Sequence, residues 1–226
     1  MKRWLSILAM LAVAASAAYG MEIRFHLQAF GGVSSSLYAG SSPGGWGIPE
    51  VSAAMNRRAG LAAGFGAGMT LPLADVVYYV ASFEYLQKGA GVDYYYWDDP
   101  ISRDIYQLDE IGHSSFIKLK PLRRLSPYGL IGYSFSYVLS HKLKTHSGSA
   151  EPVDLTSDTA RHDNGPVLGW GVEFEGRRWG FFVEHRHYFG GANLSKMTGS
   201  LADYPSLRAR SDIVIAGIRY TLGGRR

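Results

Sequence analysis

The sequence predicts an all-β protein, namely an eight-stranded antiparallel up-and-down transmembrane β-barrel. Two observations predict this fold. One segment alternates apolar residues with residues that have almost no side chain, and the predicted strands are joined by connections that alternate between short and long. Neither feature is expected of a soluble β-sandwich. Its exposed strand faces carry polar side chains, and its connections have no reason to alternate in length.

Residues 58–71 carry the first of these signals. The residues of one parity are apolar: Leu61, Ala63, Phe65, Ala67, Met69 and Leu71. From Gly60 to Thr70, the residues of the other parity are glycine, alanine or threonine. Successive side chains of a strand point to opposite faces, so one face is apolar and the other is nearly bare. We expect the apolar face to meet lipid and the bare face to leave room for bulky groups inside a narrow barrel.

Alternation and turn residues predict eight strands in order along the chain. The last strand continues the pattern, because Val214, Ala216 and Ile218 alternate with Ile215, Gly217 and Arg219. Charged residues repeatedly share the parity of the glycines. The predicted strands are 22–37, 58–71, 75–88, 112–121, 127–141, 165–175, 179–190 and 208–222.

The connections between these strands alternate in length. Residues 72–74, 122–126 and 176–178 form short turns, and the long connections are 38–57, 89–111, 142–164 and 191–207. Short periplasmic turns and long external loops are typical of outer-membrane barrels. An even number of strands returns both chain ends to the periplasm, and closure removes the edge strands that lipid cannot satisfy.

The N-terminus predicts export. Residues 1–20 combine a basic start, a short apolar run and small residues before Met21, as a cleaved signal peptide does. The barrel domain is then 21–226. The chain contains no cysteine, which excludes disulfides and thiol catalysis. Its formal net charge of +4 does not indicate a nucleic-acid partner, because the protein is exported and its basic residues do not cluster on an RNA- or DNA-binding motif.

Aromatic residues near the strand ends predict two interfacial girdles, as in other membrane barrels. The predicted periplasmic girdle is Tyr79, Tyr128, Trp179 and Tyr220. The predicted outer girdle is Tyr38, Tyr85, Tyr137 and Phe189.

Nine charged residues and one histidine fall on the inward parity: Arg24, His26, Glu84, Lys88, Lys118, Lys120, Glu173, Glu184, Arg186 and Arg219. Six of them form the candidate interior charge network: Glu84, Lys118, Glu173, Glu184, Arg186 and Arg219. An arginine or lysine facing the lipid midplane costs ~2–4 kcal/mol, so these groups are expected inside and paired. A structural plug is favoured over a catalytic or proton-relay cluster. We expect no cofactor and no metal, since His185 and His187 have the spacing of a metal pair but no evident third ligand.

One long connection carries an acidic and aromatic tract that is the candidate contact patch: Tyr94, Tyr95, Tyr96, Trp97, Asp98 and Asp99. Exposed tyrosine and tryptophan in a loop favour contact with a partner. The tract lacks the spacing of an EF-hand, so calcium binding is not favoured. A mobile loop without a ligand is the alternative.

Several tracts resemble the PorT-like outer-membrane β-barrel family. They include Phe83 to Ala90, Ile117 to Leu122, Pro127 to Gly132, Gly169 to Glu173 and Arg186 to Leu194. The resemblance implies an eight-stranded barrel in the outer membrane of a Gram-negative bacterium, and for some members a link to protein secretion to the cell surface. Residues Gly217 to Leu222 also resemble the C-terminal signal that the barrel assembly machinery reads.

These observations favour a structural or surface-interaction barrel over an enzyme. Its expected partners are outer-membrane lipid and an unknown surface partner. An outer-membrane lipid-modifying hydrolase is the first alternative, but Phe189 stands where the serine of a His-x-Ser motif is needed after His187. A barrel accessory to secretion is the second. A soluble barrel with a ligand cavity is the third, and it requires an apolar interior and a polar outside.

Overall fold

The computed structural model describes residues 24–40, 51–74, 76–97, 99–121, 125–145, 151–196 and 207–222. Within them no helix is long and apolar enough to cross a membrane. The predicted signal peptide, residues 1–20, lies outside the described residues, so its cleavage stays a prediction.

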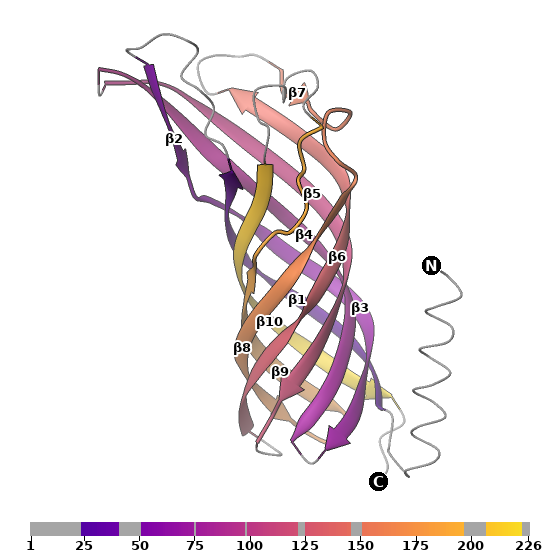
Figure 1. The fold of residues 1–226 in the computed structure, drawn as a ribbon. Helices are drawn as coiled ribbons and strands as arrows, with labels where there is room; N and C mark the ends of the chain where they lie inside the picture. Colours follow the sequence, from indigo (N-terminus) through magenta and orange to yellow (C-terminus); the bar gives the residue numbers. More distant parts are fainter. Residues whose placement is uncertain are drawn as a thin grey trace.

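The described residues form ten strands in one antiparallel sheet (Figure 1). Their bounds are β1 (Arg24–Gly40), β2 (Val51–Asn56), β3 (Arg58–Ala74), β4 (Val77–Tyr96), β5 (Asp99–Leu119), β6 (Leu125–Thr145), β7 (Val153–Asp154), β8 (His162–Glu175), β9 (Trp179–Tyr188) and β10 (Leu207–Leu222).

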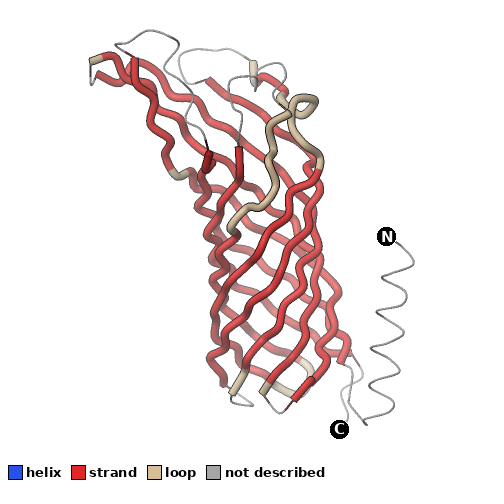
Figure 2. Tube along the Cα trace, in the orientation of Figure 1, coloured by secondary structure: helices blue, strands red, loops and turns tan. Residues whose placement is uncertain are grey.

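Eight of these strands close into a ring. Going round it, β1, β3, β4, β5, β6, β8, β9 and β10 each pair with the next strand, and β10 pairs with β1. Among the described residues, the short strand β2 pairs only with the upper part of β4, and β7 adds two residues beside β6. Figure 2 shows the tilted strands wrapping the barrel. The predicted eight-stranded up-and-down barrel is confirmed.

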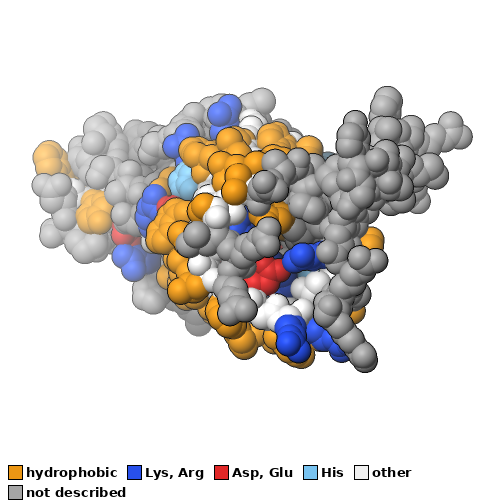
Figure 3. Space-filling model, turned by 90° about the horizontal axis from the view of Figure 1, so that it is seen from below, with side chains coloured by type: hydrophobic (Ala, Val, Ile, Leu, Met, Phe, Trp, Pro, Cys, Tyr) orange, Lys and Arg blue, Asp and Glu red, His pale blue; other side chains and the backbone are white. Residues whose placement is uncertain are grey.

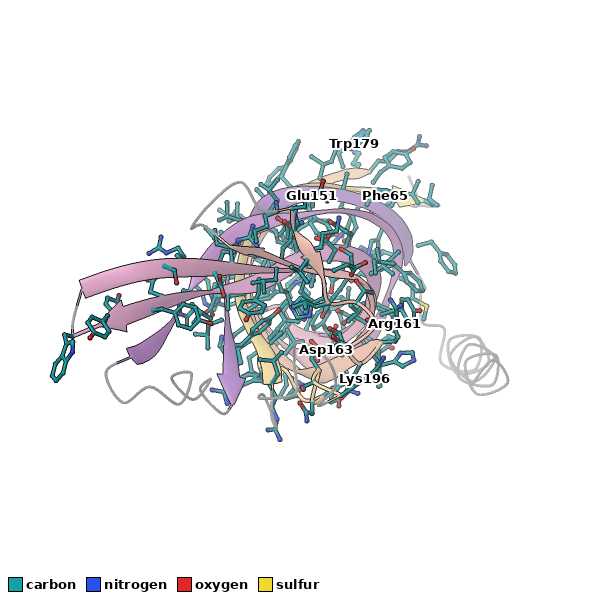
Figure 4. The ribbon with its side chains drawn as sticks, turned by 90° about the horizontal axis from the view of Figure 1, so that it is seen from above. Phe65, Glu151, Arg161, Asp163, Trp179 and Lys196 are labelled. Carbon is teal, nitrogen blue, oxygen red and sulfur yellow. The ribbon has the colours of Figure 1, made fainter. Side chains whose placement is uncertain are left out.

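The outer wall is apolar. On β3, Leu61 is 67% exposed and Phe65 is 86% exposed, whereas Ala62 between them is buried. In the view from above, Phe65 and Trp179 lie on the outside of the ring (Figure 4). The predicted faces of 58–71 are therefore correct for the side chains that the structure describes. The same observation contradicts the soluble ligand-binding barrel, which needs a polar outer wall.

The glycines of β3 make room for large side chains of β1. Gly64 lies opposite Phe30 and Gly68 lies opposite His26 in the register. A Cβ atom on Gly64 would lie 2.5 Å from the Phe30 ring, and one on Gly68 would lie 2.4 Å from His26 Nε2. The bare face predicted from the sequence is thus filled from the neighbouring strand, because only glycine permits this approach.

The connection predicted at 89–111 is not a loop. β4 and β5 continue through it, and their pairing runs from Val77↔Leu119 to Tyr96↔Asp99 with one register shift near the tip. Gly and Asp lower the strand propensity of this tract, but tertiary pairing overrides propensity. The two strands form a hairpin that projects beyond the ring (Figure 1).

Two predicted girdle residues point inward. Tyr128 and Tyr38 are both buried in the barrel rather than exposed at its rim. Tyr128 donates a hydrogen bond to Glu184, and Tyr38 contacts His141. Trp179 and Tyr220 do lie together near the short turns, with ring centroids 4.8 Å apart.

Candidate functional site: the charged interior of the barrel

The barrel interior is lined by charged side chains from β4, β5, β8, β9 and β10. All six residues of the predicted network occur on inward positions of these strands, alternating with exposed apolar residues. Seen from below, acidic and basic side chains lie inside a rim of hydrophobic ones (Figure 3). The contacts divide this interior into three tiers.

The lower tier, nearest the short turns, centres on Glu173 of β8. Its carboxylate forms ion pairs with Lys118, with Lys120 at 2.7 Å and with Arg219 at 3.2 Å. Lys120 also contacts Glu175, which lies at the mouth of the barrel beside Arg24. One buried carboxylate therefore faces three cations, and the lower tier is rich in positive charge.

The middle tier centres on Arg186 of β9. Its guanidinium forms ion pairs with Glu84 of β4 and with Glu184 of its own strand. Tyr188 donates to Glu84 at 2.9 Å, and Tyr128 donates to Glu184 at 2.7 Å. Two carboxylates thus share one cation, and hydroxyl donors satisfy the remaining lone pairs as buried ions require.

The upper tier consists of Lys88, Glu110 and Asp163. The Lys88 Nζ lies 2.8 Å from Glu110 Oε2 and 3.0 Å from Asp163 Oδ2. Ser136 donates a hydrogen bond of 2.7 Å to Glu110. One oxygen of each carboxylate has no partner. A small polar cavity beside this tier is lined by Lys88, Ser134, Ser136, Asp163 and Tyr188, among others.

The sequence-based network lacks Glu110 and Asp163. Their tracts fall in the predicted connections 89–111 and 142–164, but in the structure Glu110 lies in β5 and Asp163 in β8. The alternation of residues in the sequence nevertheless indicates that both carboxylates point inward. Glu110 lies two residues before Gly112 and Asp163 two before Gly165, so extending each predicted strand by two residues places both carboxylates inside.

An apolar cluster closes the upper end of the interior. It contains side chains from five barrel strands, β1, β4, β5, β6 and β10, together with Leu155 and Leu194, which lie outside the barrel strands. Beside this cluster, the His141 ring is hydrogen-bonded through Nε2 to the Tyr38 hydroxyl at 2.8 Å and through Nδ1 to the Thr159 hydroxyl at 2.7 Å. The members are Tyr38, Ala90, Val92, Tyr94, Tyr106, Leu108, Val138, Leu155, Leu194, Leu207 and Ala209.

The candidate contact patch divides between strand and tip. Tyr94, Tyr95 and Tyr96 belong to β4, and Asp99 begins β5. Tyr94 is buried in the apolar cluster, which corrects its assignment to an exposed loop. Trp97 is 70% exposed and Tyr96 is 47% exposed, and their rings meet edge to face. Asp98 lies outside the described residues.

Two histidine sites bear on the metal and hydrolase questions. His185 and His187 face outward and both contact Asp212, yet no group of three or more His, Cys, Asp or Glu in the described part of the chain is arranged to hold a metal. On β5, His113 Nε2 lies 2.8 Å from Ser115 Oγ, but His113 Nδ1 has no partner to orient the ring. This pair therefore lacks the third member of a Ser-His-Asp arrangement.

No protein-family model and no curated protein matches the chain. Among solved structures, the outer membrane protein OprG from Pseudomonas aeruginosa is 10% identical, with a TM-score of 0.50 over 88% of this chain and 96% of that chain. Neisserial surface protein A is 13% identical, with a TM-score of 0.46 over 88% and 97%. The attachment invasion locus protein Ail of Yersinia pestis, solved with the heparin analogue sucrose octasulfate, is 12% identical, with a TM-score of 0.40 over 87% and 99%.

The likeness to OprG concerns the fold, since the identity is low. Together with the closed ring, the apolar outer wall and the charged interior, it defines the class of this protein. The chain is an eight-stranded outer-membrane β-barrel.

Proposed function

We propose that this protein is a non-conducting outer-membrane barrel that presents a β-hairpin at the cell surface for contact with a partner. The short turns between β8 and β9 and between β3 and β4 face the periplasm in this proposal, and the hairpin of β4 and β5 faces outward, as in other outer-membrane barrels. Because the interior is filled, a partner cannot bind inside the barrel. The tip of the projecting hairpin is therefore the part of the molecule suited to contact with a partner.

The length of β4 and β5 carries this proposal. The two strands have 20 and 21 residues, whereas a tilted strand crosses the membrane with about 9–11 residues. The excess continues as paired strands up to Tyr96↔Asp99. Asp93 and Arg103 form an ion pair across the projecting part, and its hydrogen bonds raise the pKa of Arg103. The hairpin is therefore a stiff arm that holds Tyr96 and Trp97 away from the lipid.

The filled interior predicts that the protein does not conduct. Eight strands enclose a space that side chains can fill, and Phe182 occupies it in the lower tier, with Arg186 and Tyr188 in the middle tier. Purified protein in planar bilayers should show no steady porin-like current, measured beside a porin in the same bilayer as a positive control. A reproducible large open channel would contradict the filled interior.

Cysteine labelling tests the orientation of the hairpin. The chain has no cysteine, so Trp97→Cys introduces a single thiol at the tip of the arm, and Arg177→Cys introduces one in the exposed turn between β8 and β9. A membrane-impermeant maleimide should label Trp97→Cys on intact cells and Arg177→Cys only after the outer membrane is permeabilised. The opposite pattern would place the arm in the periplasm and end the proposal.

The PorT-like resemblance, the signal peptide at 1–20 and assembly through the C-terminal strand fit an outer-membrane barrel, and a role beside a secretion system is compatible with a surface arm. We propose that the protein is not an enzyme. The His113–Ser115 pair on the outer wall offers a histidine beside a hydroxyl but has no third group to orient the ring, so it does not favour the lipid-modifying hydrolase.

A further inference from the structure

Basic and imidazole side chains form a band on the outer wall, directly above the apolar belt. On β10 the outward positions change from Val214 to Asp212, Arg210 and Arg208, and all four are exposed or half-buried. On the neighbouring strand β9, the outward positions change from Val183 to His185 and His187 at the same height. We define the cationic band as Arg57, His185, His187, Arg208 and Arg210, with Asp212 at its centre.

Asp212 of β10 joins Arg57, which precedes β3, to two histidines of β9. Arg57 forms an ion pair with Asp212 Oδ2, and His187 Nδ1 lies 2.7 Å from Asp212 Oδ1. His185 Nε2 lies 3.4 Å from the same oxygen. In the register, Asp212 faces His187 of β9 on one side and Ser35 of β1 on the other. Arg57, which precedes β3, therefore reaches across β1, and one carboxylate fixes a guanidinium and two imidazoles.

The band has a net positive charge and remains accessible. Its three arginines exceed the single Asp212 carboxylate, and the Arg57 side chain is 51% exposed although it is ion-paired. An arginine guanidinium has five N–H donors, so contact with one carboxylate does not use all the donors of Arg57. The band therefore keeps donors and positive charge for a further anion.

The opposite side of the barrel has a different character at the same height. There Asp109 of β5 accepts hydrogen bonds from Tyr85 at 3.0 Å, Gln87 at 3.1 Å and Ser140 at 2.7 Å. No arginine or lysine is among these partners. Exposed cations do occur farther along that side, at Lys142 and Lys144 of β6 and at Arg103 of β5, which pairs with Asp93. Among the described residues there, no carboxylate joins a guanidinium to two imidazoles, so the Asp212 cluster, rather than positive charge alone, distinguishes the β10 side.

We propose that the cationic band binds the phosphate of an anionic lipid in the outward-facing leaflet. Directly below the band, Leu61, Val33, Val214 and Val183 expose an apolar wall on which acyl chains can lie. The outward side chains of β10 thus change from apolar to charged within two residues, between Val214 and Asp212. Guanidinium groups bind phosphate oxygens in pairs, and basic clusters at a membrane surface attract anionic headgroups.

The test compares two lipids that differ only by phosphate. Native mass spectrometry of the detergent-solubilised protein measures binding of dioleoyl phosphatidic acid and of dioleoylglycerol. We expect the wild-type protein to bind phosphatidic acid more tightly by roughly tenfold, the scale of a charge-assisted hydrogen bond. Arg57→Gln/Arg210→Gln should lose most of this preference.

The control removes the same charge at the other end of the barrel. Arg177→Gln/Arg178→Gln changes the exposed turn between β8 and β9 and should keep the preference. Heat-modified migration on a detergent gel verifies that both variants remain folded barrels. Equal binding of the two lipids, or an equal loss in both variants, would overturn the proposal. Displacement of phosphatidic acid by an equal concentration of inorganic phosphate would assign the band to a free anion instead of a lipid.

Discussion

Replacing Arg186 with methionine should destabilise the barrel by about 3–5 kcal/mol, the cost of removing one partner from a buried ion pair. Glu84 and Glu184 both depend on this guanidinium and are almost completely buried. Without it, two carboxylates remain side by side in a low-dielectric interior. The measurement is the temperature at which the protein loses its heat-modified migration in detergent, together with urea unfolding in lipid vesicles.

Two variants separate this effect from a general loss of packing. Glu84→Gln/Glu184→Gln/Arg186→Met removes all three charges and should recover most of the stability, because neutral replacement of a whole buried cluster is often tolerated. Arg177→Met in the exposed turn should change little. Arg186→Met unfolding like Arg177→Met would show that the middle tier contributes nothing to stability. Loss of a lipid-hydrolysing activity without loss of stability would favour a catalytic role for the tier.

The barrel could be predicted from the sequence because side-chain direction in a strand is a local property. The parity of 58–71 alone predicts which face of β3 meets lipid, and Leu61, Phe65 and Ala62 lie where it places them. The inward position of Glu84, Glu173 and Arg186 follows from the same rule.

The partners within the interior could not be predicted in this way. Arg186 contacts a residue 102 positions away, and this contact depends on the tilt and stagger of all eight strands. Strand length is also a tertiary property. The hairpin of β4 and β5 continues because its inner face packs on the apolar cluster, so Tyr94 is buried there although its tract has the composition of a loop.

The upper tier has the same imbalance as the middle tier, which leads to a second large effect. Lys88 is the only cation in the described part of the chain that forms an ion pair with Glu110 or Asp163. Its side chain is 3% exposed, and the side chains of the two carboxylates are 1% and 2% exposed. One oxygen of each carboxylate has no partner, but Glu110 Oε2 accepts a hydrogen bond from Ser136 besides its contact with Lys88. Asp163 Oδ2 has Lys88 alone among side chains, so Asp163 is the more weakly held of the two.

Lys88→Met should therefore lower the unfolding free energy by about 3–5 kcal/mol, since it leaves both carboxylates buried without a cation. Asp163→Asn should cost far less, because Lys88 and Glu110 then remain as a balanced pair and the repulsion between the two carboxylates disappears. Lys142→Met, on an exposed position of β6, is the control and should have almost no effect. Urea unfolding of the three variants in lipid vesicles gives the comparison. If Asp163→Asn were as damaging as Lys88→Met, the tier would be held by hydrogen-bond geometry at Asp163, and the surplus of carboxylates over cations would not govern its stability.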